Sequence, residues 1–288
     1  MALEVARRLD GPPVELVTAD SMQVYRGMDI GTAKPSAAER AEVPHHLLDV
    51  ADPADDFSVA RYQRTADEAI DEIERRGHRA LLVGGTGLYV QAVVDRLDVP
   101  GQWPDVRAEL DAEPDTVALW RRLRDVDPVA ADRMVPTNRR RVVRALEVSV
   151  GSGRPFSSFG PGIQAFPPNS RFRLAGLWLP RPVAKTRIAH RFAQMLDAGL
   201  LDELRELARR PMSRTARQAL GYKELLAHLD GGSTLDEAVD TAIRRTVAFA
   251  RRQRVWFRRD PRITWFGTDA EPVAVVPALL RHWSPPCG

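Results

Sequence analysis

The chain has 288 residues, of which 44% are apolar and 28% charged, and its net charge is +3. This composition is typical of one large or two modest folded domains and excludes a mainly disordered chain. No apolar run approaches the roughly 18 residues that cross a bilayer, and Glu4, Arg7, Arg8 and Asp10 interrupt the start, so we expect a cytoplasmic protein with neither a membrane span nor a secretory leader. The single cysteine, Cys287, excludes a disulfide framework and a cysteine zinc site.

The first third of the chain alternates helical and extended patterns. Apolar residues recur at helical spacing before Gly11-Pro12-Pro13, and short apolar runs follow further on. In chain order we expect a helix over 2–9, a strand over 14–19, a helix over 58–76, a strand over 80–83 and a helix from Leu88. Wholly apolar strands that lead into helices are typical of a parallel α/β sheet.

Helical patterns dominate the remainder. Strand signals vanish from about residue 99 to residue 147, return at 173–179 and 263–266, and enclose a second helical stretch over 182–259. We therefore expect an α/β core made of residues 1–97 and 156–288, with a helical insertion over 98–155.

Charge is unevenly distributed along the chain. Residues 1–98 carry 11 basic and 18 acidic side chains, whereas the rest carries 31 and 21. An excess of arginine in the later two thirds favours an anionic partner such as nucleic acid, although a general preference for arginine would give the same count.

Asp20 directly follows the first predicted strand. Ligands of open α/β sheets bind at the carboxyl ends of strands, so this carboxylate is placed to accept a proton or to hold a metal-bound water. A simple turn-capping role is the alternative. The polar loop that follows, Gly27–Pro35, contains Lys34, which could reach an anion or could simply be solvated.

The run Gly84-Gly85-Thr86-Gly87 lies between the second predicted strand and its helix. Glycines at this position let backbone N–H groups approach a phosphate, and the helix N-terminus favours negative charge. Thr86 could donate a hydrogen bond to a leaving oxygen or could cap the helix. A glycine-rich turn that serves only packing is the competing interpretation.

Two arginine clusters support an RNA partner. Basic residues interleaved with aromatic residues suit phosphate contacts and stacking on exposed bases. The alternative is a solvated helix face whose aromatic residues lie in the core. The first cluster consists of Arg139, Arg140, Arg141 and Arg144, and the second of Arg244, Arg245, Arg251, Arg252, Arg254, Arg258 and Arg259 with Phe249, Trp256 and Phe257.

Several motifs, taken together and in order, resemble the tRNA dimethylallyltransferase family. The specific ones are Asp20–Pro35 (DSMQVYRGMDIGTAKP), Val43–Asp49 (VPHHLLD) and Gly84–Tyr89 (GGTGLY). The resemblance continues through Asp127-Pro128, Arg141–Glu147, Gly221–Glu224 and Arg251–Gln253, so that it covers nearly the whole chain.

The resemblance implies a P-loop NTPase-like α/β fold with a helical insertion that grips the tRNA anticodon arm. It implies transfer of a dimethylallyl group from dimethylallyl diphosphate to N6 of adenosine 37, beside the anticodon, with Mg²⁺. It also implies a monomer without membrane attachment.

The resemblance further implies roles for single residues. Asp20 is expected to be the general base, and Thr86 to steady the bridging oxygen of the leaving diphosphate. Diphosphate binding is expected of Lys34, Gly84, Gly85 and Arg217. Contacts with tRNA are expected of Asp20, Ser21, Met22, Gln23, Arg107, Arg140, Arg141, Val142, Val143, Arg144, Gln218, Gly221, Tyr222, Lys223, Arg251 and Arg252.

One part of the family pattern has no counterpart. The P-loop ending in Gly-Lys-Ser or Gly-Lys-Thr, which would supply a lysine for the diphosphate and a hydroxyl for Mg²⁺, is absent together with the first strand, so the metal ligand is unassigned. We therefore expect a misassigned start or a truncated gene copy, and a chain that binds tRNA but transfers prenyl groups poorly or not at all.

Three other functions compete with this one. They are a tRNA-binding remnant without catalysis, an adenylate isopentenyltransferase that acts on a free nucleotide, and a phosphotransferase of the P-loop kinase type. The helical insertion and the arginine clusters disfavour the free-nucleotide enzyme.

Overall fold

The computed structural model describes residues 1–160, 162–163, 165–168, 170–268 and 271–284, so that Cys287 lies outside the described residues. The chain divides into two compact units. Met1–Val94 and Pro168–Gly288 form one, the core unit, and Asp95–Pro167 form the other, the helical unit. The helical unit extends past residue 155, the end expected from the sequence, because Ser157 is tied to it by hydrogen bonds from its backbone N–H and its hydroxyl to Asp127.

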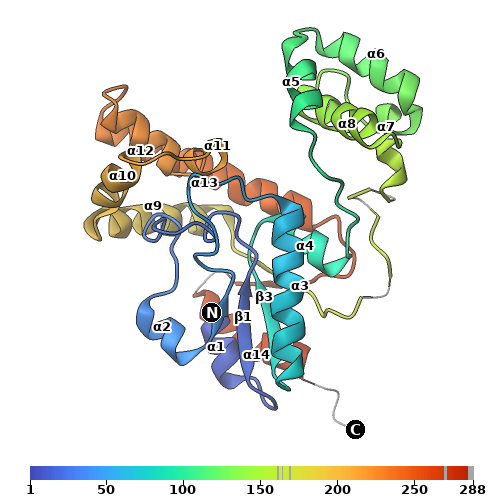
Figure 1. Cartoon of the computed structure of the whole chain (residues 1–288). Helices are drawn as coiled ribbons and strands as arrows, with labels where there is room; N and C mark the ends of the chain where they lie inside the picture. Colours follow the sequence, from blue (N-terminus) through green and yellow to red (C-terminus); the bar gives the residue numbers. More distant parts are fainter. Residues whose placement is uncertain (161, 164, 169, 269–270, 285–288) are drawn as a thin grey trace. The chain divides into compact units, whose positions relative to one another are not determined.

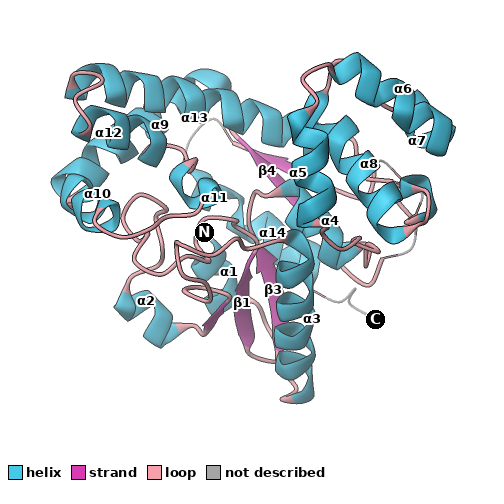
Figure 2. Ribbon diagram, turned by 45° about the horizontal axis from the view of Figure 1, so that its top comes forward, coloured by secondary structure: helices cyan, strands magenta, loops and turns pink. Residues whose placement is uncertain are grey.

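A parallel three-stranded sheet lies at the centre of the core unit (Figures 1 and 2). Its order is β2-β1-β3, with β1 at Val14–Thr18, β2 at His45–His46 and β3 at Arg79–Val83. Leu16 of β1 is in register with His45 on one side and with Leu81 on the other. Every residue of β1 is buried, as expected for a central parallel strand with both faces covered.

Helices cover both faces of this sheet, and the alternation along β1 shows how. Val14 and Leu16 pack in a cluster with Leu3 and Ala6 of α1 (Ala2–Arg8). Val17 packs on the opposite side, in a cluster with buried residues of α3 (Val59–Arg75). Figure 1 shows α1 and α3 on either side of β1. The predicted strands and helices of this region are confirmed to within two residues.

A second, two-stranded sheet pairs β4 (Ala175–Trp178) with β5 (Thr264–Gly267) in parallel. Both strands agree with the sequence-based expectation. Three short elements were not predicted from the sequence: α2 (Ala37–Glu42), β2 and α14 (Val276–Trp283). Helix α14 packs with α1 around Val5 and Leu279.

The helical stretch expected over 182–259 is broken into five helices. They are α9 (Arg181–Asp197), α10 (Leu200–Ala208), α11 (Arg214–Arg217), α12 (Tyr222–Leu229) and α13 (Leu235–Phe257). Gly199 lies between α9 and α10, and Gly221 precedes α12. Their φ angles are 95° and 86°, values that a residue with a side chain rarely adopts. A capping box of Thr234 and Glu237 starts α13.

The helical unit has a core of its own. It contains α5 (Pro104–Ala112), α6 (Thr116–Val126), α7 (Pro128–Asp132), α8 (Arg139–Ser152) and the 3₁₀ turn η1 (Phe156–Ser158). Leu110, Leu119, Leu123 and Leu146 form its fully buried centre. In the described part of the chain, no helix is long and apolar enough to span a membrane.

Candidate active site at the carboxyl ends of the strands

Asp20 and Thr86 lie beside each other, where β1 and β3 end. Asp20 Oδ1 accepts hydrogen bonds from the backbone N–H groups of Met22 at 2.8 Å and of Gln23 at 3.3 Å, which bends the chain away from the strand. Thr86 Oγ1 accepts the N–H of Ser21 at 3.1 Å and lies 3.3 Å from Ser21 Oγ, to which it donates. The two predicted catalytic residues are thus connected through Ser21.

The glycines of the second loop are required by close packing. A Cβ on Gly84 would lie 2.3 Å from the carbonyl oxygen of Ala19, far inside van der Waals contact. Backbone hydrogen bonds from Ala19 N to Val83 and from Thr86 N to Ala19 fasten the two loops to each other. The packing interpretation of this turn therefore holds, and the predicted contacts of Gly84 and Gly85 with diphosphate stay predictions.

Helix α13 covers the same loop from another side. Gln253 Nε2 donates to the carbonyl of Gly85 at 2.9 Å, and Trp256 Nε1 lies 2.3 Å from where a Cβ on Gly87 would be. Gly87 is also the first residue of α4 (Gly87–Val94). The sequence marked Trp256 only as an aromatic within a basic cluster and did not anticipate that α13 closes over the loop.

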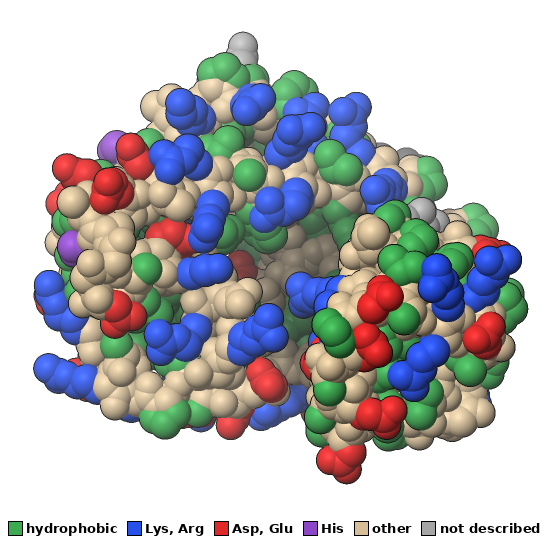
Figure 3. Space-filling view, turned by 90° about the horizontal axis from the view of Figure 1, so that it is seen from above, with side chains coloured by type: hydrophobic (Ala, Val, Ile, Leu, Met, Phe, Trp, Pro, Cys, Tyr) green, Lys and Arg blue, Asp and Glu red, His purple; other side chains and the backbone are tan. Residues whose placement is uncertain are grey.

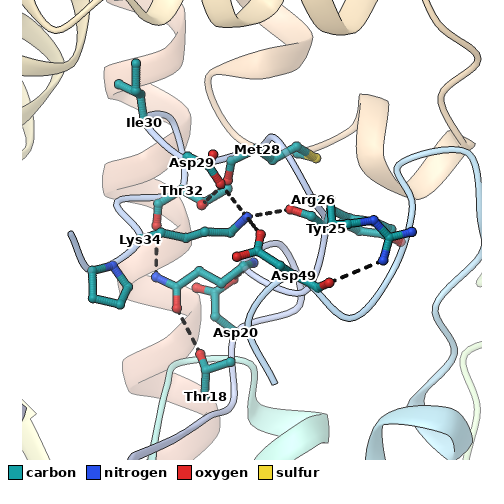
Figure 4. Close-up of polar contacts among 12 residues, drawn as sticks. Thr18, Asp20, Tyr25, Arg26, Met28, Asp29, Ile30, Thr32, Lys34 and Asp49 are labelled. Atoms are coloured by element: carbon teal, nitrogen blue, oxygen red, sulfur yellow. Dashed lines mark hydrogen bonds and ion pairs between the residues drawn. The ribbon is translucent and has the colours of Figure 1, made fainter. Parts of the chain in front are cut away.

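Lys34 is not available to a diphosphate. Its Nζ donates to the backbone carbonyl of Tyr25 at 2.5 Å and pairs with Asp29 at 2.7 Å and Asp49 at 2.6 Å, as Figure 4 shows. These three acceptors use all three N–H groups of the ammonium, and only 1% of the side chain is exposed. The predicted diphosphate contact of Lys34 is therefore wrong, because the partners of this lysine come together only in the folded loop.

Gln23 and Met22 also make contacts inside the protein. Gln23 Oε1 accepts the hydroxyl of Thr18 at 2.9 Å, and Gln23 Nε2 donates to the carbonyls of Thr32 at 3.0 Å and Ala33 at 3.3 Å. Met22 packs against the main core. Both side chains are partly exposed, so their predicted tRNA contacts stay predictions.

Arg191 of α9 belongs to this site, although the sequence did not single it out. Its side chain is exposed. Desolvation by the surrounding protein lowers the pKa of Arg191, and the carboxylate of Asp20 acts in the opposite direction. The guanidinium is therefore within electrostatic reach of Asp20 and stays charged. Arg191 lies in a run of alternating basic and apolar residues that reads as an ordinary amphipathic helix.

The stretch around Gly221 divides into exposed and buried residues. Arg217, Gln218 and Lys223 are exposed, and the Arg217 guanidinium forms no hydrogen bond or ion pair with any residue that the structure describes. Gly221 and Tyr222 are buried, with 1% of Tyr222 exposed. The predicted contact of tRNA with the Tyr222 side chain is therefore wrong, since burial against the core occupies that ring.

The segment that contains the first arginine cluster also divides into exposed and buried residues. Arg140 and Arg141 of α8 are exposed, whereas Val142 and Val143 are fully buried in the core of the helical unit. Two adjacent residues are buried because α8 packs on α5 and α6 at once. The prediction that Val142 and Val143 contact tRNA is therefore corrected. Their side chains pack in the core of the helical unit and stabilise α8, the helix that carries Arg140 and Arg141.

Arg144 and Arg107 have intramolecular partners. Arg144 donates to Glu147 at 2.8 Å and to the carbonyls of Pro100 and Gly101 at 2.9 Å each. Arg107 pairs with Asp111 at 2.8 Å. Arg144 thus holds the segment before α5 to α8, and Arg107 pairs within α5, so neither is a freely exposed cation of the kind that the sequence led us to expect.

The second arginine cluster lines an open groove on α13 of about 410 Å³. Figure 3 shows Lys and Arg side chains exposed over the helices of the core unit. Two arginines lie over aromatic rings, Arg252 at 5.5 Å from the Phe249 centroid and Arg254 at 4.7 Å from that of Trp178. The groove is lined by Ala248, Arg251, Arg252, Val255, Trp256 and Arg259. Its positive rim and apolar floor suit a nucleic-acid strand.

A sequence profile decides the family. The profile described as IPP transferase matches residues 23–260. The chain belongs to the IPP transferase family. Curated relatives agree: the tRNA dimethylallyltransferase of Thermobifida fusca is 47% identical over 94% of this chain and 86% of its own length, and that of Streptomyces coelicolor is 47% identical over 96% and 88%.

Solved structures extend this IPP transferase assignment to the fold. The tRNA isopentenylpyrophosphate transferase of Bacillus halodurans is 40% identical, with a TM-score of 0.68 over 97% of this chain and 89% of that one. A eukaryotic dimethylallyltransferase acting on tRNA shares the fold with a TM-score of 0.76 at 24% identity, over 95% of this chain and 73% of that one. The predicted P-loop NTPase-like α/β fold is confirmed.

The IPP transferase match begins at residue 23 and so leaves out Asp20. The position of Asp20 in the site thus rests on geometry: it follows the buried β1 and accepts hydrogen bonds from the backbone N–H groups of Met22 and Gln23. Its carboxylate also favours the charged form of the Arg191 guanidinium.

A resident metal site is not part of this geometry. Within the described ranges, no group of three or more His, Cys, Asp or Glu side chains is arranged to hold a metal ion. Mg²⁺ is commonly bound through substrate phosphates and waters with only one or two carboxylates. The described side chains therefore form no cluster that would hold Mg²⁺ by itself, and the ion would need phosphate oxygens of the substrate among its ligands.

Proposed function

We propose that this protein transfers a dimethylallyl group from dimethylallyl diphosphate to N6 of the adenosine at tRNA position 37. Family membership supports the reaction class. The structural observation that carries the proposal is the pair of hydrogen bonds between Thr86 and Ser21, the residue directly after Asp20, because they join the two strand-end loops. The relatives named above act on tRNA, and the exposed arginines of α8 and α13 supply the positive surface that such a substrate needs.

Asp20 has the chemistry of the base. The N6 amine of adenine is a weak nucleophile because its lone pair is delocalised into the ring. A carboxylate within about 3 Å that takes the amine proton as the carbon–nitrogen bond forms increases the rate by roughly 10²–10⁴-fold. Asp20 uses Oδ1 for its own turn, and no described residue donates to its other oxygen.

The second half of the reaction is departure of the diphosphate. Negative charge grows on the bridging oxygen as the allylic carbon–oxygen bond breaks, and fixed donors aimed at that oxygen lower the barrier most. In our proposal Thr86 and the guanidinium of Arg191 are the donors for this oxygen, and Arg217 is a further exposed cation. Mg²⁺ would enter with the diphosphate and neutralise part of its charge.

The target base has to leave the anticodon loop to reach Asp20. Extrusion costs less for an unpaired loop nucleotide than for one in a duplex. In our proposal Arg140 and Arg141, with Arg251 and Arg252 of the groove, hold the anticodon arm while the base is extruded. The protein acts as a monomer in the cytoplasm in this proposal.

Mass spectrometry of tRNA tests the function. We expect N6-dimethylallyladenosine at position 37 in cells that carry the gene and unmodified adenosine in cells in which it is disrupted. Restoring the gene should restore the modification, and restoring it with Asp20→Asn should not. Unchanged position 37 after disruption would contradict the proposal.

Labelled substrates separate the competing functions. With dimethylallyl diphosphate labelled in the prenyl group, label in tRNA supports our proposal and label in AMP indicates an adenylate isopentenyltransferase. Label transferred from the γ-phosphate of ATP indicates a kinase. Tight tRNA binding with no transfer by the wild-type protein indicates a binding protein without catalysis.

A further inference from the structure

A single carboxylate from α10 holds the tip of the loop that follows Asp20. Glu203 Oε2 accepts the backbone N–H groups of Asp29 at 2.9 Å and Ile30 at 2.7 Å, and Oε1 accepts that of Gly31 at 3.2 Å. Three consecutive N–H groups that converge in this way form an anion-binding nest. Here the anion is a side chain of the protein, 172 to 174 residues further along the chain.

Tyr222 completes the arrangement. Its hydroxyl donates to Glu203 Oε1 at 2.5 Å. Burial raises the pKa of the Tyr222 hydroxyl, and the Glu203 carboxylate raises it further, so the proton stays on the tyrosine oxygen. The ring lies so close to Gly31 that a Cβ there would be 2.4 Å from it. The loop tip is therefore held by one carboxylate and one ring.

Hydrogen bonds connect this tip to the candidate base. The carbonyls of Thr32 and Ala33, directly after the nest, accept from Gln23 Nε2. The backbone N–H of Gln23 in turn donates to Asp20 Oδ1 at 3.3 Å. Figure 4 shows Asp20, Thr18 and Thr32 around this connection. A shift of residues 29–33 would therefore move Gln23 and turn the Asp20 carboxylate.

We propose that Glu203, with its partner Tyr222, is a positioning residue that fixes the orientation of Asp20 through the loop tip and Gln23. The proposal rests on the proposed function, in which Asp20 accepts the amine proton. Charge-assisted hydrogen bonds are about twice as strong as neutral ones, so a carboxylate suits this task better than an amide. Glutamine in its place would also turn an N–H group toward one of the four donors.

The test compares Glu203→Gln with Glu206→Gln, a matched control on α10 whose exposed side chain pairs with Arg209 and with no other residue that the structure describes. We expect Glu203→Gln to lower kcat by about 10- to 100-fold, because a small misplacement of a reacting group costs up to about 10²-fold. KM for tRNA should stay within about twofold. Tyr222→Phe keeps the ring against Gly31, removes one of four donors and should lower kcat less.

Hydrogen exchange gives a readout that does not depend on activity. In Glu203→Gln the amides of residues 29–31 should exchange at least about tenfold faster than in the wild type, while Glu206→Gln and the wild type exchange alike. A thermal unfolding curve checks that each variant is folded.

The outcomes separate the two proposals. An unchanged kcat in folded Glu203→Gln, or unchanged exchange at residues 29–31, would overturn the positioning role. A wild-type chain that binds tRNA but transfers nothing would contradict the proposed function and the catalytic part of this inference with it, and exchange would still decide whether Glu203 holds the loop.

Discussion

Asp20 combines a structural and a chemical role in one carboxylate, and the two can be separated. Oδ1 holds the turn by accepting two backbone N–H groups. We expect Asp20→Asn to keep this turn, since the amide oxygen accepts the same bonds, but to remove the proton acceptor. Turnover of dimethylallyl transfer should fall at least about 100-fold while the Kd for tRNA changes little.

Asp10→Asn is the matched control for this variant, because Asp10 is exposed in the turn before β1, at the other end of the strand from Asp20. Steady-state transfer and tRNA binding are measured on both variants. Near-normal turnover in Asp20→Asn would remove Asp20 as the base.

Glu15 supplies a pH-dependent part of the stability. Burial in β1 would raise the pKa of Glu15, but hydrogen bonds from His46, His78 and Arg76 outweigh it and lower the pKa from 4.5 to about 2. The folded state therefore holds this carboxylate ionised more strongly than the unfolded state does. The resulting stabilisation is complete above about pH 4.5 and is lost as the pH falls toward about 2.

Urea unfolding at pH 7, 4.5 and 3 measures this effect in Glu15→Gln and in Glu72→Gln, whose exposed carboxylate also pairs with Arg76. We expect Glu15→Gln to be less stable at pH 7 and to lose less free energy of unfolding on acidification. Parallel pH dependences in the wild type and both variants would contradict the assignment.

At the scale of residues, the sequence predicted which side chains lie near the strand ends and failed where long-range contacts decide the surroundings of a side chain. Asp20 and Thr86 could be placed because each directly follows an apolar strand. The burial of Lys34 in an ion pair could not be predicted, since Asp49 comes close to it only after the loop folds. Arg191 gave no signal, because its proximity to Asp20 depends on how α9 packs.

Among the elements, the strand-end loops depend on a close backbone approach. We expect Gly84→Ala to lower the free energy of unfolding by about 1–3 kcal/mol, because the new Cβ would meet the backbone of Ala19 and the two loops would have to separate. Gly101→Ala is the control, as its Cβ would lie 3.5 Å from Trp103, in ordinary contact. Equal stabilities in thermal unfolding would show that the loops can separate at no cost.

The exposed arginines of α8 should be visible in the salt dependence of tRNA binding. Each phosphate contact that is lost reduces the slope of log K against log salt by roughly 0.7–0.9. For Arg140→Gln with Arg141→Gln we therefore expect a slope smaller by about 1.4–1.8. The control pair, Arg205→Gln with Arg209→Gln, removes exposed arginines of α10 and should leave the slope unchanged. Identical slopes in all three proteins would make the α8 arginines a solvated face.

Helical periodicity explains which predictions succeeded at this scale. Regular apolar spacing located α1 and α3, whereas the break at Gly199 depends on a left-handed backbone that spacing does not reveal. The motif that suggested Val142 and Val143 as contacts carries no information about direction. Only the packing of α8 between two neighbours shows that both valines point inward.

In the described part of the molecule each of the two units has buried leucines of its own, and each unit should respond to its own mutations. Leu123 is fully buried in the helical unit, and Leu204 is fully buried in the core unit. We expect Leu123→Ala to cost about 2–5 kcal/mol and to accelerate hydrogen exchange mainly within 95–167. Leu204→Ala should accelerate it mainly in the core unit. Exchange that rises throughout the chain in both variants would indicate a single cooperative unit.

The contact between Gln253 and Gly85 joins positions 168 residues apart in the chain. A ribosome adds about 5–20 residues per second, so the strand-end loop waits about 8–34 s for α13 to be synthesised. During that time Gly85 and Gly87 lack their cover, while the helical unit, encoded between the two partners, has already emerged. The strand-end loop therefore stays without its cover for seconds and is completed only when α13 has been synthesised.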